Sequence, residues 1–131
     1  MKRVWVNGSF DILHVGHIRL LKYASSLGHL KVGLDSDNRI SSRKGLDRPI
    51  NKLEDRIEMI ESLKYVNEIS TFDSEIELKN LIREWEPDIM VVGDDYIDKT
   101  VYGKEFVNEI IFFEKIPNYS TTNILKKLRN D

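Results

Sequence analysis

The sequence contains no cysteine, and this absence excludes disulfide bonds, thiolate catalysis and cysteine-ligated zinc sites. It also lacks any apolar run near the ~18 residues that cross a membrane, and its first residues lack the apolar core of a secretion signal. An excess of basic charge is missing too, since 20 Lys and Arg stand against 22 Asp and Glu. Binding to duplex nucleic acid is therefore not expected. We expect a cytoplasmic protein that contacts neither membranes nor nucleic acids.

What is present is a chain of ordinary globular composition. Its 131 residues are one domain's worth, and 40% hydrophobic residues are enough to form a core. Short apolar runs alternate along the chain with amphipathic segments. The predicted strands cover residues 4–6, 30–34, 66–71, 89–92 and 110–113. The predicted helices cover residues 17–27, 52–64, 74–85, 104–108 and 120–128.

This alternation predicts an α/β fold, a single Rossmann-like domain over residues 1–131. We expect a five-stranded, mostly parallel sheet with helices on both faces. Residues 35–49 are polar and are expected to form a loop. Asn51 is predicted to cap the next helix, with Glu54 at the capping-box position. Ligands of such folds bind beyond the carboxyl ends of the strands, so the loops at those ends are the segments that matter.

The loop after the first predicted strand carries two histidines around a glycine, in the order His14-Val15-Gly16-His17. Gly16 allows a ligand to approach the backbone closely. His17 is expected to begin the helix, where exposed N–H groups and the helix dipole favour an anion. One histidine at such a place is usually a surface or capping residue. Two of them, in the first loop of an α/β fold, favour the binding of a phosphate group that gains charge during a reaction.

Together with Gly8-Ser9-Phe10-Asp11, the segment His14-Val15-Gly16-His17 resembles the signature of the cytidylyltransferase-like nucleotidyltransferases. Two later segments are similar to further elements of that family. Gly93-Asp94-Asp95-Tyr96 resembles its nucleobase-side turn, and Ser120-Thr121-Thr122-Asn123-Ile124 resembles its phosphate-binding helix start. The resemblance covers nearly the whole chain. It implies transfer of a nucleotidyl group from a nucleoside triphosphate to a phosphorylated sugar or polyol, with release of pyrophosphate.

The resemblance also implies roles for individual residues. His14, His17 and Lys44 would be catalytic, with the histidines on the triphosphate and Lys44 on its β and γ phosphates. Nucleotide binding is implied for Gly8, Ser9, Phe10, Gly16, Gly93, Asp94, Ser120, Thr121 and Thr122. Mg²⁺ is expected to arrive with the triphosphate rather than in a metal site of the protein. The resembled enzymes are commonly homodimers, so a homodimer is expected here.

Two branches of the family fit the chain. Residues 44–56 are similar to the nucleotidyltransferase domain of ADP-heptose synthase, which implies ATP and heptose 1-phosphate as substrates. Chain length and the Gly93-Asp94-Asp95 turn instead resemble glycerol-3-phosphate cytidylyltransferase, which implies CTP. That branch usually has Arg-Thr before its last helix, where Lys115 and Ile116 stand here. The sequence favours the heptose type, and the glycerol phosphate type remains the alternative.

Arg48 and Arg56 are the predicted ligands of the acceptor's phosphate. Arg56 falls inside the apolar stripe of its predicted helix, and a buried unpaired charge is very costly, so it must have a partner. A phosphate held bidentately is one such partner. A neighbouring carboxylate or strand-end carbonyl is the other. Arg48 and Lys44 lie in the predicted loop, where a solvated charge is the alternative to a phosphate ligand.

Two other classes of protein are alternatives to a nucleotidyltransferase. A receiver-like signalling domain is also a small five-stranded α/β unit, but it needs acidic clusters after its first and third strands. The corresponding segments here, Asn7-Gly8-Ser9 and Thr71-Phe72-Asp73, do not contain such clusters, which disfavours a receiver-like domain. A nucleotide sensor without catalysis, on the same fold as the enzyme, stays open as an alternative, although the intact histidine pair favours an enzyme.

Overall fold

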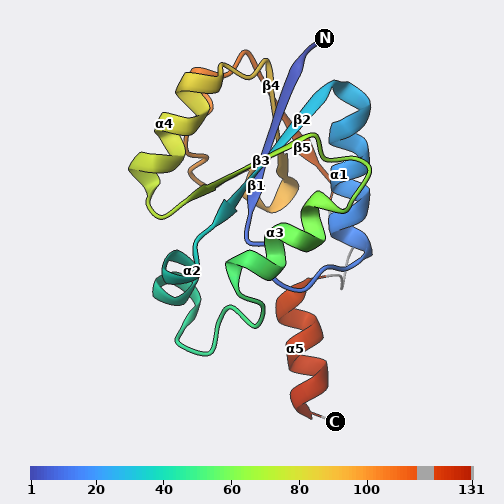
Figure 1. The fold of residues 1–131 in the computed structure, drawn as a ribbon, viewed down its shortest axis with the longest axis vertical. Coiled ribbons are helices and arrows are strands. Elements are labelled where there is room, and N and C mark those ends of the chain that lie inside the picture. Colours follow the sequence, from blue (N-terminus) through green and yellow to red (C-terminus); the bar gives the residue numbers. More distant parts are fainter. Residues whose placement is uncertain (115–119, 131) are drawn as a thin grey trace.

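A five-stranded sheet forms the centre of the molecule in the computed structural model, which describes residues 1–114 and 120–130 (Figure 1). The strand order is β3-β2-β1-β4-β5, and every neighbouring pair is parallel. The strands are β1 (Arg3–Gly8), β2 (His29–Asp35), β3 (Glu68–Phe72), β4 (Ile89–Gly93) and β5 (Glu109–Phe113). The predicted Rossmann-like α/β fold is confirmed, and its sheet is parallel throughout rather than mostly so.

Helices cover both faces of the sheet, as predicted. On one face, α1 (Val15–Leu27) contacts β1 and β2, and α3 (Leu53–Glu61) contacts β2 and β3. On the other face, α4 (Glu75–Trp85) packs against β3, and Figure 1 shows α1 and α4 on opposite sides of the strands. Two further helices, α2 (Asp37–Lys44) and α5 (Thr121–Asn130), lie toward the end of the sheet where β1 and β2 finish (Figure 1). The short 3₁₀ helices are η1 (Asp94–Tyr96) and η2 (Lys104–Phe106).

The central strand β1 shows why both faces need cover. Val4 and Val6 belong to the core that α1 and α3 complete, whereas Trp5 belongs to the core completed by α4. All three side chains are buried. Because successive side chains of a strand point to opposite faces, the buried part of β1, residues 4–6, is apolar at each position rather than at alternate ones. Such short continuous apolar runs are the signal by which the sequence predicts the strands.

The helix α2 corrects the prediction that residues 35–49 form a loop. Ser36 caps it by accepting a hydrogen bond from the backbone N–H of Arg39. Of its eight residues only Ile40 is buried, so the segment has no apolar periodicity that could indicate a helix. The cap of α3 is a second correction. Lys52 holds the N-cap position without a side-chain bond, while Asn51 donates its side-chain amide to the carbonyl of Asp11.

The strand order makes β1 the switch point of the fold. The chain passes from β1 to β2 and β3 on one side and then returns to place β4 on the other side of β1. At such a point the crossovers diverge and leave a crevice beyond the carboxyl ends of the strands, where ligands of α/β proteins bind. Gly8, Asp35 and Gly93 are the last residues of the three central strands. Their ends define where a site is expected.

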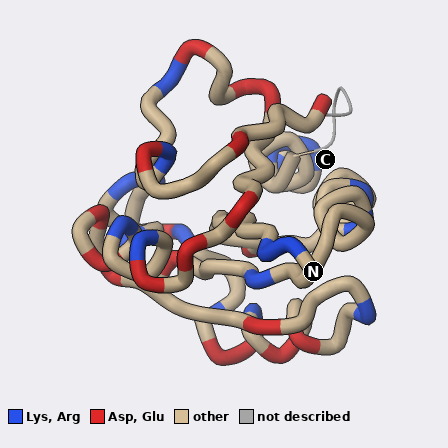
Figure 2. The backbone as a smooth tube through the Cα atoms, turned by 90° about the horizontal axis from the view of Figure 1, so that it is seen from above, with Lys and Arg blue, Asp and Glu red and all other residues tan. Residues whose placement is uncertain are grey.

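The chain carries charges of both signs. Figure 2 shows Lys and Arg interspersed with Asp and Glu, in keeping with the formal net charge of −2. Within residues 1–114 and 120–130 there is no helix of the length and apolar character needed to span a membrane. The expectation that the chain binds no nucleic acid stays a prediction.

Candidate active site

A cavity of about 570 Å³ opens at the carboxyl ends of the central strands. It is lined by most of the residues that the sequence singles out: Gly8, Ser9, Phe10, His14, Gly16, His17, Lys44, Gly93, Ser120, Thr121 and Thr122. These come from β1 and the loop after it, α1, α2, β4 and the start of α5. Segments more than a hundred residues apart in the sequence thus converge on one crevice.

His14 and His17 form a stacked pair at the N-terminus of α1. Their ring centroids lie 3.8 Å apart, with 27° between the ring planes. His14 is the N-cap, and its Nδ1 accepts from the backbone N–H of Gly16 at 3.1 Å. His17 Nδ1 accepts from the backbone N–H of His14 at 3.2 Å, which completes a capping box built from two imidazoles. The backbone of the first helical turn therefore fixes the orientation of both rings.

This arrangement has a chemical consequence for each imidazole. A nitrogen that accepts a hydrogen bond carries no proton, so in the neutral rings of His14 and His17 the proton is on Nε2. Both residues line the cavity. The pair can therefore present N–H donors to an anion at a helix N-terminus, where the dipole also favours negative charge. A phosphate that gains charge in a transition state is the kind of group such donors stabilise.

Phe10 and Gly8 hold the histidine loop against β1. Phe10 adopts a left-handed backbone conformation with φ of 48° and is buried. Its ring centroid lies 5.0 Å from that of His17. A Cβ at Gly8 would come within 3.1 Å of the Phe10 ring, so any larger residue at position 8 would press on the ring that supports His17. The roles of Gly8 and Phe10 in this structure are thus to shape the loop.

Lys44, the last residue of α2, brings an ammonium group to the cavity from the β2 side. Its Nζ donates to the hydroxyl of Ser9 at 3.4 Å. Burial lowers the pKa of Lys44, and the nearby Arg48 and Arg43 lower it further, against the opposing effect of Asp35 and Asp11. A phosphate that binds beside Lys44 would stabilise its charged form, because the anion offsets the effects of burial and of the nearby arginines.

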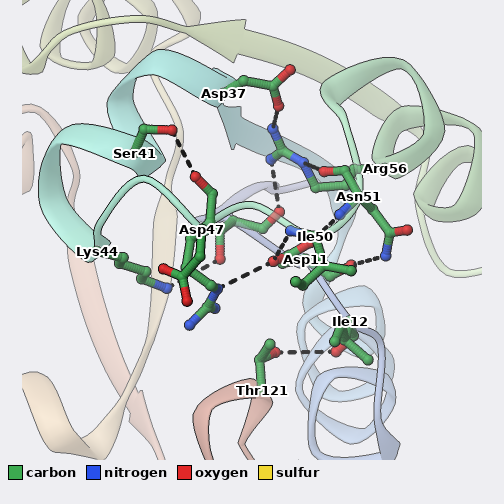
Figure 3. A network of polar contacts seen from close by, with 12 residues as sticks. Asp11, Ile12, Asp37, Ser41, Lys44, Asp47, Ile50, Asn51, Arg56 and Thr121 are labelled. Carbon is green, nitrogen blue, oxygen red and sulfur yellow. Dashed lines mark hydrogen bonds and ion pairs between the residues drawn. The ribbon is translucent and has the colours of Figure 1, made fainter. Parts of the chain in front are cut away.

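The start of α5 contributes hydroxyl groups from the far end of the sequence. Ser120 caps the helix, since its Oγ accepts from the backbone N–H of Asn123 at 3.0 Å. Thr121 Oγ1 donates to the carbonyl of Ile12 at 3.2 Å, which ties α5 to the histidine loop (Figure 3). The predicted segment Ser120–Thr122 is therefore beside the histidine pair. Lys115 and Ile116, which bear on the choice between ATP and CTP, lie outside the described residues.

At the end of β4 the structure replaces one predicted residue by its neighbours. Gly93 lines the cavity, but the residues of η1 that reach it are Asp95 and Tyr96 rather than Asp94. The 3₁₀ turn, with three residues per turn, carries successive side chains in different directions. On this side the lining continues with residues 99–102, none of which was singled out from the sequence.

Arg56 is the clearest correction to the predicted site. Its side chain is completely buried, and its guanidinium donates to the carbonyls of Asn51, Ser9 and Asp35 at 2.8 to 3.0 Å (Figure 3). It also pairs with the carboxylate of Asp37 at 2.8 Å. Among the described residues, the lining of the cavity does not include it. The carbonyl and carboxylate partners, which the sequence left open as the alternative, are the ones the structure gives it.

Arg48 is also turned inward rather than toward the cavity. Its Nε lies 3.4 Å from a carboxylate oxygen of Asp11, and both side chains are buried. Asp11 accepts in addition from the backbone N–H groups of Ile50 and Asn51, at 2.8 and 2.7 Å (Figure 3). Asp11 belongs to the first motif, but nothing in the sequence shows that it would anchor a segment forty residues away. Among the described residues the cavity lining does not include Arg48, so this geometry gives its predicted role in acceptor binding no support.

The sequence missed a basic group on the β2 side of the cavity. Asp35, Arg39 and Arg43 all line it. The carboxylate of Asp35 lies 3.2 Å from Arg39 Nε and 3.7 Å from Arg43 Nη1. Burial raises the pKa of Asp35, although Arg39, Arg43, Lys44 and Arg56 all act to lower it. The four-residue spacing of Arg39 and Arg43 places them on one face of a helix. Because the segment is predicted to be a loop, this spacing does not enter the prediction made from the sequence.

The donor groups of the described residues do not form a resident metal site. The described residues contain no group of three or more His, Asp or Glu side chains placed to hold a metal ion. Of the described residues, two carboxylates line the cavity: Asp35 ends β2 and Asp95 follows β4, on opposite sides of β1. A divalent cation in this cavity would have to take most of its oxygen ligands from a bound polyphosphate and water, as Mg²⁺ commonly does.

Comparisons with known proteins cover nearly the whole chain. A family model described as cytidylyltransferase-like matches residues 5–127. The Bifunctional protein HldE of Campylobacter fetus subsp. fetus (strain 82-40) is 44% identical over 127 residues, which are 96% of this chain and 28% of the relative. The protein of the same name from Helicobacter pylori (strain HPAG1) is 43% identical over 129 residues, 98% of this chain and 28% of the relative. The chain thus spans less than a third of the length of these curated relatives.

Solved structures give the same picture of the fold. A lipopolysaccharide core biosynthesis protein from Thermoplasma volcanium GSS1 superposes with a TM-score of 0.74 at 30% identity, over 88% of this chain and 98% of that chain. A protein of unknown function from Archaeoglobus fulgidus superposes with a TM-score of 0.66 at 20% identity, over 91% and 93% of the two chains. The second likeness concerns the fold alone.

Proposed function

Because the chain belongs to the cytidylyltransferase-like family, we propose that it transfers a nucleoside monophosphate from a nucleoside triphosphate to a phosphorylated sugar or polyol. Pyrophosphate is the second product. The observation that carries the proposal is the stacked pair of His14 and His17, held by the first turn of α1 and facing the cavity at the switch point of the sheet. The family and the HldE relatives both indicate a nucleotidyltransferase.

The reaction is a substitution at the α-phosphorus. An oxygen of the acceptor's phosphate forms the new P–O bond, and the bond from the α-phosphorus to the bridging oxygen breaks, its electron pair leaving with pyrophosphate. The acceptor phosphate is already ionised, so no nucleophile or base of the protein is required. The protein aligns the two phosphates and stabilises the charge that builds on the α-phosphate and the leaving group. His14 and His17 supply Nε2–H donors for this purpose.

Lys44 and the start of α5 are proposed to hold the leaving pyrophosphate. Lys44 brings a cation from the end of α2, and Ser120, Thr121 and Thr122 bring hydroxyl and backbone N–H groups at a helix N-terminus. Mg²⁺ would arrive with the triphosphate and would offset part of its negative charge. Gly93 and its neighbours Asp95 and Tyr96 form the side on which the nucleobase is proposed to lie.

For the substrates we propose ATP and a heptose 1-phosphate. Support comes from the similarity of residues 44–56 to ADP-heptose synthase and from the HldE relatives at 40–44% identity. The solved relative described as a lipopolysaccharide core biosynthesis protein is a further support. CTP and glycerol 3-phosphate are the alternative, and a nucleotide sensor without catalysis is a more remote one. A cytoplasmic location is part of the proposal, since both substrates are charged metabolites.

The test is a matrix of two nucleotides and two acceptors. ATP and CTP are each incubated with heptose 1-phosphate and with glycerol 3-phosphate, and pyrophosphate release is followed together with the sugar nucleotide formed. The proposal expects the highest kcat/KM for ATP with heptose 1-phosphate. A preference for CTP with glycerol 3-phosphate would overturn the choice of substrates but keep the reaction. Nucleotide binding without pyrophosphate release from any pair would favour the sensor.

A further inference from the structure

Arg39 and Arg43 form a basic wall on the β2 side of the cavity. They stand one turn apart on the face of α2 that lines it. Asp35, at the end of β2, lies within ion-pair distance of both, 3.2 Å from Arg39 and 3.7 Å from Arg43. The Arg39 guanidinium also lies over the ring of Phe72, 5.5 Å from its centroid. The strand end and the neighbouring ring thus hold the Arg39 guanidinium in place, while Arg43 is paired with Asp35 alone among these groups.

This wall carries more positive charge than its one carboxylate compensates. Two guanidiniums share Asp35, and Lys44 adds a third cation at the end of the same helix. The side chain of Arg39 is only 12% exposed, and its Nε is buried without a hydrogen bond of acceptable geometry. Buried cations are stable when anions pair with them, so an excess of this kind favours an anionic ligand. The side chain of Arg43 is 51% exposed and can turn toward a ligand.

The strand order indicates which of the two substrates supplies the anion that the basic wall binds. The β2 and β4 ends lie on opposite sides of β1, which carries the loop of His14 and His17. On the β4 side the lining contains the rings of Tyr96 and Tyr102 and the apolar side chain of Val101, and such rings suit a nucleobase. Asp95, Lys99 and Thr100 add polar groups on the same side. A nucleotide with its α-phosphate at the histidines, its β and γ phosphates at Lys44 and its base on the β4 side leaves Arg39 and Arg43 for the second substrate.

From this placement we propose that Arg39 and Arg43, aligned by Asp35, bind the phosphate of the acceptor and thereby select acceptors that carry a dianionic phosphate. The proposal rests on the nucleotidyl transfer proposed above. It replaces the pair expected from the sequence, since Arg48 and Arg56 are buried behind the loop. Arg39 and Arg43 would act as substrate ligands, and Asp35 as the positioning residue that orients them. A planar guanidinium suits this task because it can donate two parallel hydrogen bonds to one phosphate.

The test separates binding of the acceptor from binding of the nucleotide. Arg43→Gln and Arg39→Gln are compared with Arg19→Gln, an exposed arginine on α1 outside the cavity lining that gives the same change of charge. The two cavity variants should raise the KM for the acceptor about 10- to 100-fold, the scale expected for one lost charge-assisted interaction. The KM for the nucleotide should stay within about twofold, and Arg19→Gln should leave both unchanged. Arg39→Lys, which keeps the charge but not the fork, should recover only part of the loss.

Calorimetry measures acceptor binding directly and therefore tests the inference independently of turnover. Heptose 1-phosphate and glycerol 3-phosphate are each titrated into wild type and Arg43→Gln in the presence of a non-hydrolysable nucleotide. Binding to wild type that is weakened in the variant would support the acceptor site even if no product forms, in which case only the proposed transfer fails. Equal acceptor binding in both proteins, or an unchanged acceptor KM in both cavity variants, would overturn the inference. Melting curves establish that each variant is folded, which matters most for the largely buried Arg39.

Discussion

The carboxylate of Asp11 accepts a hydrogen bond from the backbone N–H of Asn51 at 2.7 Å, across forty residues of sequence. Asp11 is completely buried, and the same carboxylate also binds the N–H of Ile50 and the guanidinium of Arg48. In return the side chain of Asn51 donates to the carbonyl of Asp11 at 2.5 Å. This exchange fixes the segment between α2 and α3 to the loop that carries the histidines. The shape of the active-site loop therefore depends on a carboxylate that does not line the cavity.

Removing the charge of Asp11 should destabilise the protein strongly. In Asp11→Asn one carboxylate oxygen becomes an amide donor that faces backbone N–H donors, and Arg48 loses its partner. We expect the free energy of unfolding to fall by roughly 3–5 kcal/mol, the range for breaking a buried ion pair. Chemical denaturation monitored by circular dichroism measures this. Asp98→Asn, at an exposed position, is the matched control and should change stability little; equal stability of the two variants would contradict the role given to Asp11.

The histidine pair should be needed for turnover. His14→Ala and His17→Ala each remove a donor from the proposed transition state, and we expect kcat to drop by roughly 10²–10⁴-fold. Each also removes part of the capping box of α1, which should cost about 1 kcal/mol of stability. Steady-state kinetics and thermal melting on the same samples separate the two effects. His29→Ala, which changes a histidine paired with Glu68 at the far end of β2, should keep full activity; near-normal kcat in both cavity variants would refute the assignment.

Replacement of Arg56 should affect folding rather than catalysis. Lysine can reach one or two of the four oxygens that the guanidinium binds, so Arg56→Lys leaves buried carbonyls unsatisfied. A loss of roughly 2–4 kcal/mol in the free energy of unfolding is expected from that deficit. The kcat/KM of the remaining folded enzyme should be near that of wild type. Unchanged melting together with a large loss of activity would instead support the phosphate contact predicted from the sequence.

Activity should fall at high pH as Lys44 loses its proton. Burial and nearby arginines lower the pKa of Lys44 below its usual 10.5, so deprotonation begins at a lower pH than for an exposed lysine. The neutral amine no longer attracts the triphosphate, and the KM for the nucleotide should rise as the pH passes through that pKa. In Lys44→Arg the cation persists at all accessible pH values, so this rise should move to higher pH. Profiles of kcat/KM from pH 7 to pH 10 provide the measurement, and identical profiles for both proteins would exclude Lys44 as the titrating group.

The protein is predicted to be a homodimer. The helix α5 extends away from the sheet in Figure 1, and none of its residues 121–130 is buried. Leu128 on α5 is 67% exposed, and Leu46, in the segment joined to α5 by the Arg129–Asp47 ion pair, is 98% exposed. Light scattering at micromolar concentration should report about twice the chain mass of 15.3 kDa. A value near 15.3 kDa would contradict the dimer.

The parts of the fold that the sequence predicted are those with strong apolar patterns. β1, β4 and β5 contain short continuous apolar runs, and α4 shows a clear stripe with Leu78 and Ile82 buried. α2 was missed because its stability comes from the Ser36 cap and from ion pairs to Asp35, neither of which produces periodicity. Local pattern reasoning detects apolar faces, and a polar helix over the end of a sheet has almost none.

For the site, the sequence located the loops but not the direction of long side chains. The histidine pair was predictable because a helix N-terminus fixes its geometry locally. Arg56 was assigned to a phosphate, although its partners are carbonyls of Ser9, Asp35 and Asn51 that only the tertiary fold brings to it. Arg39 is the opposite case: it was not predicted to belong to the site, but it lines the cavity because it lies on α2, a helix that was not predicted from the sequence.

The hydrogen bond from Thr121 to the carbonyl of Ile12 makes the two ends of the described chain interdependent. Because α5 buries none of its residues 121–130, the sheet and its two cores gain little stability from it. The same helix nevertheless supplies Ser120–Thr122 to the cavity. We therefore expect the core to fold independently of the docking of α5, which completes the site. Occupancy of the cavity by a triphosphate should protect the backbone amides of α5 from hydrogen exchange far more than it protects those of the central strands.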